Sequence, residues 1–393
     1  MLEDLIEDYL RLGLALGRHI DGLVDAYYGP REYADAAAAA PPEPPAVLAD
    51  RARRLIGALA VDRDLDSSRR TWLTAQVRGL HTTARKLSGE PIGYLDEIEE
   101  CYGVKVDLVP EEVFSEGHKR LDEVLPGDGN LAERYIAWRE KQAVAPDVLG
   151  TAVQSLAEDF RERTDRSFGL PVGERVEFEL VNDKPWSGFN YYLGGLRSRV
   201  AINTDLPVLS TQLGPLVAHE AYPGHHTEHS RKEAGLVRRR SQLEETIFLV
   251  GTPQCLLAEG LADLGIEVIA GRRPEPVIAE HLEPLRVPYD ADLVGQLSVA
   301  GEALGGVRGN AAILIHDRGM DPDDAVAYMS RWSLLPRPRA EKAVQFLVDP
   351  TWRAYAFCYI EGLRLCRAYV SGDPARFERL VTEQIVPSDL AAA

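Results

Sequence analysis

The sequence is poor in cysteine and contains no long apolar run. Only four of its 393 residues are cysteine, at positions 101, 255, 358 and 366, and none forms a C-x-x-C pair. A cysteine-based zinc site is therefore not indicated, and the long chain does not have the pattern of a disulfide framework, so we expect buried or half-buried thiols in a reducing compartment. No apolar run reaches the roughly 18 residues of a membrane-spanning helix. The first residues are acidic, unlike those of a signal peptide. We therefore expect a cytoplasmic protein.

Basic residues are also in deficit, with 44 lysines and arginines against 62 acidic residues, which gives a net charge of −18. A field of this sign repels phosphate backbones and anionic membranes, so we expect neither nucleic-acid nor membrane partners. Hydrophobic residues make up 45% of the chain and charged residues 27%, which is a globular composition. The composition does not indicate an oligomeric state.

Apolar residues recur at helical spacing in most of the chain. The pattern predicts helices over residues 1–28, 47–88 and 110–168, the last broken at 126–129. An alanine run and the prolines of 41–45 predict an exposed connection between the first two helical segments.

The pattern changes near residue 175. Residues 176–181 alternate apolar and polar, and 191–196 and 199–203 are also strand-like. We predict a mainly α fold with one small antiparallel sheet directly before the histidine-rich segment described next. The predicted regions are an N-terminal helical region, 1–175, and a catalytic region, 176–393, packed as one compact unit.

Four of the nine histidines lie within eleven residues. The segment reads His219-Glu220-Ala221-Tyr222-Pro223-Gly224-His225-His226-Thr227-Glu228-His229. Neutral imidazole is the commonest metal ligand in proteins, and a carboxylate beside it suits a general base. The segment therefore predicts a metal site without thiolate ligands.

The segment does not contain the usual H-E-x-x-H zinc motif, because position 223 is proline. The histidine that follows His219 is six residues away, and on a regular helix six residues turn about 600° and rise about 9 Å. Both rings could not then bind one zinc at about 2.0–2.1 Å. Pro223 lacks an N–H and clashes with the carbonyl of His219, and Gly224 permits unusual backbone angles. A distorted helix could therefore bring His225 back to His219.

A second register has easier geometry. His225 and His229 are four residues apart and share a helix face without distortion, and Glu228 between them would be the base of an inverted H-x-x-E-H motif. The spacing leaves both registers open.

A third ligand is expected on a later helix. Glu259 and Asp263 lie four residues apart on one face of an apolar helical run. Glu259 is the candidate ligand, and Asp263 could orient a ligating histidine by accepting its second N–H. The structural alternative is a half-exposed acidic stripe.

Residues 219–226 closely resemble the signature of the bacterial domain-of-unknown-function 885 family. Four further segments resemble the family over much of residues 90–370: 199–203, Ala258-Glu259-Gly260-Leu261-Ala262, His316-Asp317-Arg318-Gly319 and Tyr359-Ile360-Glu361-Gly362. Leu261 and Met320 stand where the family pattern has tryptophan. The resemblance implies a zincin-like helical metallopeptidase fold with one zinc per chain. It favours His219, His225 and Glu259 as ligands and Glu220 as the base, with His226 and His229 in reserve.

Other residues receive roles that each have an ordinary structural alternative. Tyr359 and His316 could donate hydrogen bonds to a tetrahedral oxyanion. Arg197 and Arg199 could bind a substrate carboxylate, and Tyr222 could contact substrate or only pack. The strand at 199–203 could pair with an extended peptide.

These residues predict a zinc metallopeptidase in which Glu220 activates water at the zinc and passes its proton to the leaving nitrogen. The substrate would be a peptide or a small amide. Two alternatives remain: a non-catalytic peptide-binding protein with a degenerate zincin cleft, and a zinc hydrolase of a non-peptide amide or ester. The intact Glu220 favours catalysis over binding alone.

Overall fold

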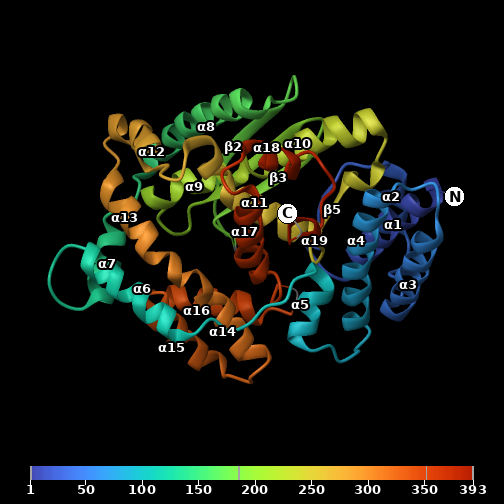
Figure 1. Cartoon of the computed structure of the whole chain (residues 1–393), viewed down its shortest axis with the longest axis horizontal. Coiled ribbons are helices and arrows are strands. Elements are labelled where there is room, and N and C mark those ends of the chain that lie inside the picture. The colour runs from blue at the N-terminus through green and yellow to red at the C-terminus, as the bar shows by residue number, and fades with distance from the viewer. Residues whose placement is uncertain (1, 185, 351, 392–393) are drawn as a thin grey trace.

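The structure is a computed structural model that describes residues 2–184, 186–350 and 352–391. It is mainly helical with two small sheets, which confirms the predicted fold class at that level (Figure 1). None of the helices in the described ranges has the length and apolarity needed to span a bilayer. The four cysteines are buried and unpaired.

The N-terminal helices pack together at one end of the molecule (Figure 1). They are α1 (Leu2–Leu16), α2 (Arg31–Ala39), α3 (Pro45–Val61) and α4 (Ser67–Leu87). Their shared core includes Tyr9, Leu48 and Trp72, each at most 1% exposed. Helices α3 and α4 occupy the predicted segment 47–88. The alanine run, predicted as part of a connection, instead forms α2, because alanine has the highest helix propensity.

The prediction of one helix over residues 1–28 is wrong. Helix α1 ends at Leu16, and β1 (Val24–Tyr27) pairs antiparallel with β5 (Ile247–Leu249). The pairing joins segments more than 200 residues apart, and no local periodicity can reveal such a partner. It also links the predicted N-terminal region to the predicted catalytic region.

The second group of helices continues the chain to the main sheet. They are α5 (Tyr94–Tyr102), α6 (Glu111–Val124), α7 (Leu131–Glu140) and α8 (Pro146–Phe168). The last three cover the predicted segment 110–168, and the break at 126–129 falls between α6 and α7. Asn130 ends that break by capping α7, because its side chain accepts the N–H of Glu133.

The main sheet has three strands, β2 (Arg175–Val181), β3 (Gly188–Gly194) and β4 (Arg197–Asn203), in the order β2-β4-β3. The predicted strands are present, but the sheet is mixed and not antiparallel, because β2 runs parallel to β4. Strands β3 and β4 form a hairpin whose turn has positive φ at Gly194, Gly195 and Leu196. Strand β4 is therefore central, and the prediction that 199–203 offers a free edge for a peptide is wrong. The edge beside the histidine-rich segment belongs to β3.

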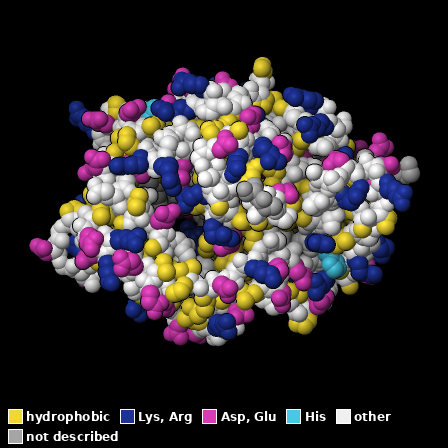
Figure 2. All heavy atoms as spheres, in the orientation of Figure 1, with side chains coloured by type: hydrophobic (Ala, Val, Ile, Leu, Met, Phe, Trp, Pro, Cys, Tyr) yellow, Lys and Arg dark blue, Asp and Glu magenta, His cyan; other side chains and the backbone are white. Residues whose placement is uncertain are grey.

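The remaining helices build the C-terminal half. They are α9 (Ser210–Glu220), α10 (His225–Lys232), α11 (Pro253–Ala270), α12 (Glu275–Leu282), α13 (Ala291–Gly301), α14 (Val307–His316), α15 (Pro322–Trp332), α16 (Arg337–Val348), α17 (Ala356–Val370), α18 (Pro374–Leu380) and α19 (Pro387–Ala391). Short segments of π or 3-10 geometry lie at Glu233–Arg238, Leu243–Thr246, Glu283–Leu285 and Glu302–Gly306. Helices α11 and α17 lie at the centre of the molecule, and Figure 2 shows a hollow on this face near them.

Helices α11 and α17 cross with their backbones in contact. A Cβ at Gly260 would lie 2.1 Å from the carbonyl carbon of Gly362, and one at Gly362 would lie 2.2 Å from the Leu256 oxygen. Only glycine fits at this crossing. Glu259 directly precedes Gly260 on α11, and its Oε1 accepts a hydrogen bond from Tyr355, the residue before α17.

Candidate metal centre

The helix that carries the histidine-rich segment is broken in its middle. Helix α9 ends at Glu220, α10 begins at His225, and Ala221 and Gly224 have non-helical backbone angles. The Tyr222–Pro223 peptide bond is cis. The Gly224 N–H donates to the Ala218 oxygen at 2.9 Å, so the chain folds back against the end of α9.

The break brings the rings of His219 and His225 into an edge-to-face contact. The His219 and His225 ring centroids are 4.6 Å apart and the rings are perpendicular. Six residues of regular helix would separate them by about 9 Å along the axis. The distortion expected at Pro223 and Gly224 is therefore present.

Helix α11 adds a carboxylate to this pair. His219 Nε2 lies 3.4 Å from Glu259 Oε2, and His225 Nε2 lies 3.5 Å from Glu259 Oε1. One ligand atom from each of the three residues lies within 4.8 Å of the others. Within the described ranges this is the only group of histidine, cysteine or acidic residues with such spacing.

The surrounding hydrogen bonds orient the three groups. His219 Nδ1 donates to Asp263 Oδ1 at 2.7 Å, which leaves Nε2 facing Glu259. The Tyr355 hydroxyl donates to Glu259 Oε1 at 2.7 Å. The other oxygen of Glu259 is buried without a hydrogen-bond partner in the described residues. Because a buried carboxylate oxygen normally has a partner, this atom fits a ligand position, and two imidazoles with one carboxylate suit zinc.

The charges in the cluster depend on each other. Burial opposes ionisation of Glu259, but His225 and His219 outweigh it and hold the pKa of Glu259 below its ordinary value. Burial likewise opposes a charged His219, but Asp263 and Glu259 raise its pKa, and Glu259 does the same for His225. The carboxylates thus stabilise positive charge at the position where the ligand atoms converge.

The three residues open onto one pocket, which Glu220 also lines. The other lining residues are Asp25, Gly188, Phe189, Asn190, His229, Phe248, Val250, Tyr355 and Tyr359. Glu220 is 6% exposed, and burial raises the pKa of its carboxyl. Asn190 Nδ2 donates to the Glu220 carbonyl at 2.6 Å, which ties the end of α9 to β3.

Of the other predicted site residues, some line the pocket and some lie outside it. The Tyr359 ring stacks on His219 at 6.3 Å and lines the pocket. His316 lies outside the pocket lining, with Nε2 at 2.7 Å from the Leu347 oxygen. Arg197 and Arg199 are exposed on β4, where Arg199 forms an ion pair with Glu179 at 3.4 Å. The structure therefore does not bring His316 or these arginines to the pocket.

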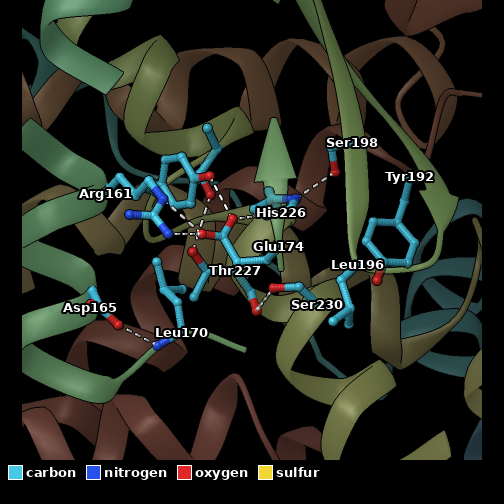
Figure 3. Close-up of polar contacts among 12 residues, drawn as sticks. Arg161, Asp165, Leu170, Glu174, Tyr192, Leu196, Ser198, His226, Thr227 and Ser230 are labelled. Atoms are coloured by element: carbon cyan, nitrogen blue, oxygen red, sulfur yellow. Dashed lines mark hydrogen bonds and ion pairs between the residues drawn. The ribbon is translucent and has the colours of Figure 1, made fainter. Parts of the chain in front are cut away.

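Two of the predicted residues join a separate buried network around Glu174. The Tyr222 hydroxyl and His226 Nε2 donate to Glu174 Oε2 at 2.7 and 2.8 Å. Arg161 donates to the other oxygen at 2.8 Å, and His226 Nδ1 lies 2.8 Å from Ser198 Oγ (Figure 3). Both nitrogens of His226 are thus occupied. Tyr222 and His226 flank the helix break, so the network holds the break in position.

Of the residues of the inverted H-x-x-E-H register, only the motif histidines, His225 and His229, line the pocket. His229 lines the pocket and stacks on Tyr192 at 4.8 Å, and burial lowers its pKa well below the ordinary value. Glu228 is 1% exposed, lies outside the pocket lining and accepts a hydrogen bond from Lys232 at 2.7 Å. The base of the inverted motif is therefore turned away from the pocket.

Sequence reasoning missed four residues here: Asp25, Glu174, Asn190 and Tyr355. Tyr355 lies one helical turn before Tyr359, so a four-residue spacing was a usable signal. Asp25 and Asn190 reach the pocket from strands, and Glu174 directly precedes β2. No local pattern connects those three residues to the histidines.

Comparisons with known proteins give a fold and no family. No family model and no curated protein matches the chain. A candidate lipoprotein from Colwellia psychrerythraea has 18% sequence identity and a TM-score of 0.51, with 87% of this chain and 65% of that one covered. A candidate lipoprotein of unknown function from Shewanella oneidensis has 14% identity and a TM-score of 0.52, with coverages of 91% and 74%. This chain spans about two thirds to three quarters of their lengths, and at these identities the likeness shows the fold alone.

The resemblance to the domain-of-unknown-function 885 family is therefore wrong as an assignment. No family model matches, and the solved structures that share the fold are named as candidate lipoproteins. The resemblance depended on residues 219–226 and a few short segments, two of which lack the expected tryptophan. A short histidine-rich segment can reflect similar chemistry without common membership of a family.

Proposed function

We propose that this chain is a zinc-dependent hydrolase of peptide bonds. One observation carries the proposal: His219, His225 and Glu259 converge beside Glu220 in one pocket, and a buried oxygen of Glu259 has no hydrogen-bond partner among the described residues. Catalytic zinc sites commonly use two histidines and one glutamate and leave a further position open. The proposal depends on this chemistry and on no family.

Each of the pocket residues would have a distinct role in hydrolysis. His219, His225 and Glu259 would hold one zinc, with Asp263 keeping His219 in the required tautomer. A bound zinc would supply Lewis-acid polarisation of the attacked carbonyl and of water. Glu220 would take a proton from water and deliver it to the leaving nitrogen, and its raised pKa makes it a better proton acceptor than an exposed glutamate.

Tyr359 would stabilise the oxyanion. Burial raises the pKa of its hydroxyl well above the ordinary value, so the group keeps its proton and can donate it in a hydrogen bond. Its ring lies on His219, on the pocket side of α17. His316 has no such position, so we assign the role to Tyr359 alone.

The sheet supports a peptide as the substrate. Strand β3 pairs with β4 on one side, and no described strand pairs with its other side. Its residues Gly188, Phe189 and Asn190 line the pocket beside Glu220. An extended peptide could add to this edge by backbone hydrogen bonds. A zincin-like arrangement, with an edge strand beside the ligand-bearing helix, is the finer fold that we propose.

The names of the structural relatives bear on location. Lipoproteins are lipid-anchored, so the two relatives suggest a site outside the cytoplasm, against the cytoplasmic expectation from the sequence. Fractionation of the native host cells, with antibody detection, tests the two locations.

The function is tested by digestion of a broad peptide library, which is then read by mass spectrometry. Zinc-loaded protein should cleave a subset of peptides, and chelation followed by zinc readdition should abolish and restore the cleavage. Peptide retention without cleavage at any metal load would contradict the hydrolase and support a binding protein. Cleavage of esters but no peptides would contradict the peptide substrate.

A further inference from the structure

A carboxylate that the proposed mechanism does not use faces the same pocket. Asp25 belongs to β1, the strand that the N-terminal part of the chain contributes, and lines the pocket with Glu220 and Glu259. Among the described residues it has no hydrogen bond or ion pair. Asp25 is half-buried, so its carboxylate faces the pocket and is free to accept hydrogen bonds from a ligand there.

Asn190 provides a second acceptor in the same pocket. Its side chain is 6% exposed, and Nδ2 is occupied by the Glu220 carbonyl. Its Oδ1 is buried and has no hydrogen-bond partner in the described part of the chain. The strands that carry Asp25 and Asn190 contact each other, so the pocket presents two acceptors that lack donors.

The chemistry of the missing partner follows from the charges. Asp25 offers carboxylate oxygens and Asn190 Oδ1 is an amide oxygen, so both groups only accept and the partner must supply the donors. A carboxylate makes its stronger hydrogen bonds with positively charged donors, which favours a cationic partner at Asp25. The described residues contain no second metal-capable cluster that includes Asp25. A cationic group with N–H donors, an ammonium, satisfies both acceptors.

The neighbouring wall is apolar. Phe248 and Val250 line the pocket, and each is 6% exposed. Phe248 lies in β5, the strand that pairs with β1, and Val250 directly follows β5. An ammonium bound at Asp25 would thus have an apolar surface beside it. This combination matches the first residue of a peptide, which joins a charged amino group to a side chain at one carbon.

We propose that the pocket receives the free amino terminus of a peptide, with Asp25 and Asn190 Oδ1 accepting from its α-ammonium group. The proposal rests on the proposed function and deepens it: the bond presented to Glu220 would be the first peptide bond, and the protein an aminopeptidase. Asp25 is then the residue that selects a free amino end with an apolar first side chain over an internal peptide segment.

The test compares peptides that differ only in the amino group. Zinc-loaded protein carrying Glu220→Gln, which should reduce turnover by about 10²–10⁴, is titrated calorimetrically with Leu-Ala-Ala, N-acetyl-Leu-Ala-Ala and N-acetyl-Lys-Ala-Ala. We expect Leu-Ala-Ala to bind about 10- to 100-fold more tightly than its acetylated form, the range for hydrogen bonds to a charged group. Adding Asp25→Asn, which is nearly isosteric, should abolish the preference. Adding Asp21→Asn, an exposed residue just before β1, should leave it intact.

Each other outcome has a defined meaning. Equal binding of the two leucine peptides, no binding of any peptide, or a preference that survives Asp25→Asn would overturn the ammonium site. Tight binding of N-acetyl-Lys-Ala-Ala would move the ammonium to a side chain and overturn the aminopeptidase. The peptide comparison on the protein with intact Asp25 does not depend on how the Asp25 variant folds.

Hydrolysis, measured with intact Glu220, separates this proposal from the proposed function. If Leu-Ala-Ala binds with the expected preference but no peptide is cut, the hydrolase fails and the ammonium site stands. If free and acetylated peptides are cut at equal rates, the hydrolase stands and the ammonium site fails.

Discussion

The main chain at Gly224 lies so close to His219 that a Cβ at position 224 would sit 1.9 Å from the His219 carbonyl oxygen. This approach lets the chain fold back after α9, so that the His225 ring reaches 4.6 Å from the His219 ring. A residue with a side chain would have to push the two apart. The spacing of the proposed zinc ligands therefore depends on a glycine that is not itself a ligand.

Gly224→Ala should weaken zinc binding and lower stability, because backbone must move to make room for the methyl group. We expect a loss of about 1–3 kcal/mol or more in the free energy of unfolding, measured by urea denaturation alongside zinc titration. The matched control is Gly150→Ala in α8, where nothing lies within 4 Å of the added Cβ. There the change should be neutral or stabilising by up to about 1 kcal/mol. Similar effects at both positions would contradict the close-approach argument.

The metal content should be one zinc per chain, lost on substitution of a proposed ligand. His219→Ala, His225→Ala and Glu259→Ala should each reduce zinc in chelator-free protein, measured by atomic emission. His316→Ala is the control, because that histidine lies outside the pocket lining and contacts the Leu347 carbonyl. Protein without zinc, together with an unchanged result for His219→Ala, would sink the metal assignment.

The general base is decided by two nearly isosteric changes. Glu220→Gln should reduce turnover by about 10²–10⁴, the contribution of a positioned base, without loss of zinc. Glu228→Gln should stay within a few-fold of the parent in turnover, because Glu228 binds Lys232 away from the pocket. The reverse pattern would assign the base to Glu228 and restore the inverted register.

The network around Glu174 should support the metal site without touching it. Glu174→Gln removes the charge that Tyr222, His226 and Arg161 bind, and we expect a loss of about 1.5–3 kcal/mol in unfolding free energy. Zinc affinity should fall too, because two of those partners flank the helix break. Glu177→Gln on β2 is the control: its side chain is 70% exposed, and such changes usually stay within about 0.5 kcal/mol. Unchanged zinc affinity in Glu174→Gln would show that the network is structural only.

Stability should depend on pH through Glu245. Burial raises the pKa of this carboxyl from 4.5 to about 7, and the negative charges of Glu244 and Glu228 add to the shift. Lys232 and Gln384 lower the pKa, but by less. The folded state therefore holds this proton more tightly than the unfolded state, and the destabilising contribution grows as pH rises from about 4.5 to about 7 and is constant above that.

Glu245→Gln removes that titration. Relative to the parent, the variant should gain about 2–3 kcal/mol in unfolding free energy between pH 5 and pH 8, as measured by urea denaturation. Glu177→Gln, on the exposed face of β2, should show no comparable gain. A constant difference between the Glu245 variant and the parent across this range would contradict the raised pKa.

The sequence by itself determined the features that depend on neighbours along the chain. Helical periodicity predicted most helices of the first half, and alternation predicted the strands of the main sheet. Pro223 and Gly224 predicted a break in the histidine-rich helix, because proline lacks an N–H and glycine lacks a Cβ. The spacing of Glu259 and Asp263 put both on one helix face, where the structure has them.

Only the tertiary structure decided what depends on partners far along the chain. The pairing of β1 with β5 turned part of a predicted helix into a strand and brought Asp25 to the pocket. The contact of Gly260 with Gly362 fixed Glu259 beside the histidines. Tyr222 and His226, which on spacing alone were candidates for the site, donate hydrogen bonds to Glu174 instead. The physical reason is that strand pairing and close packing join residues that no local pattern relates, and these contacts select which polar side chains face the pocket.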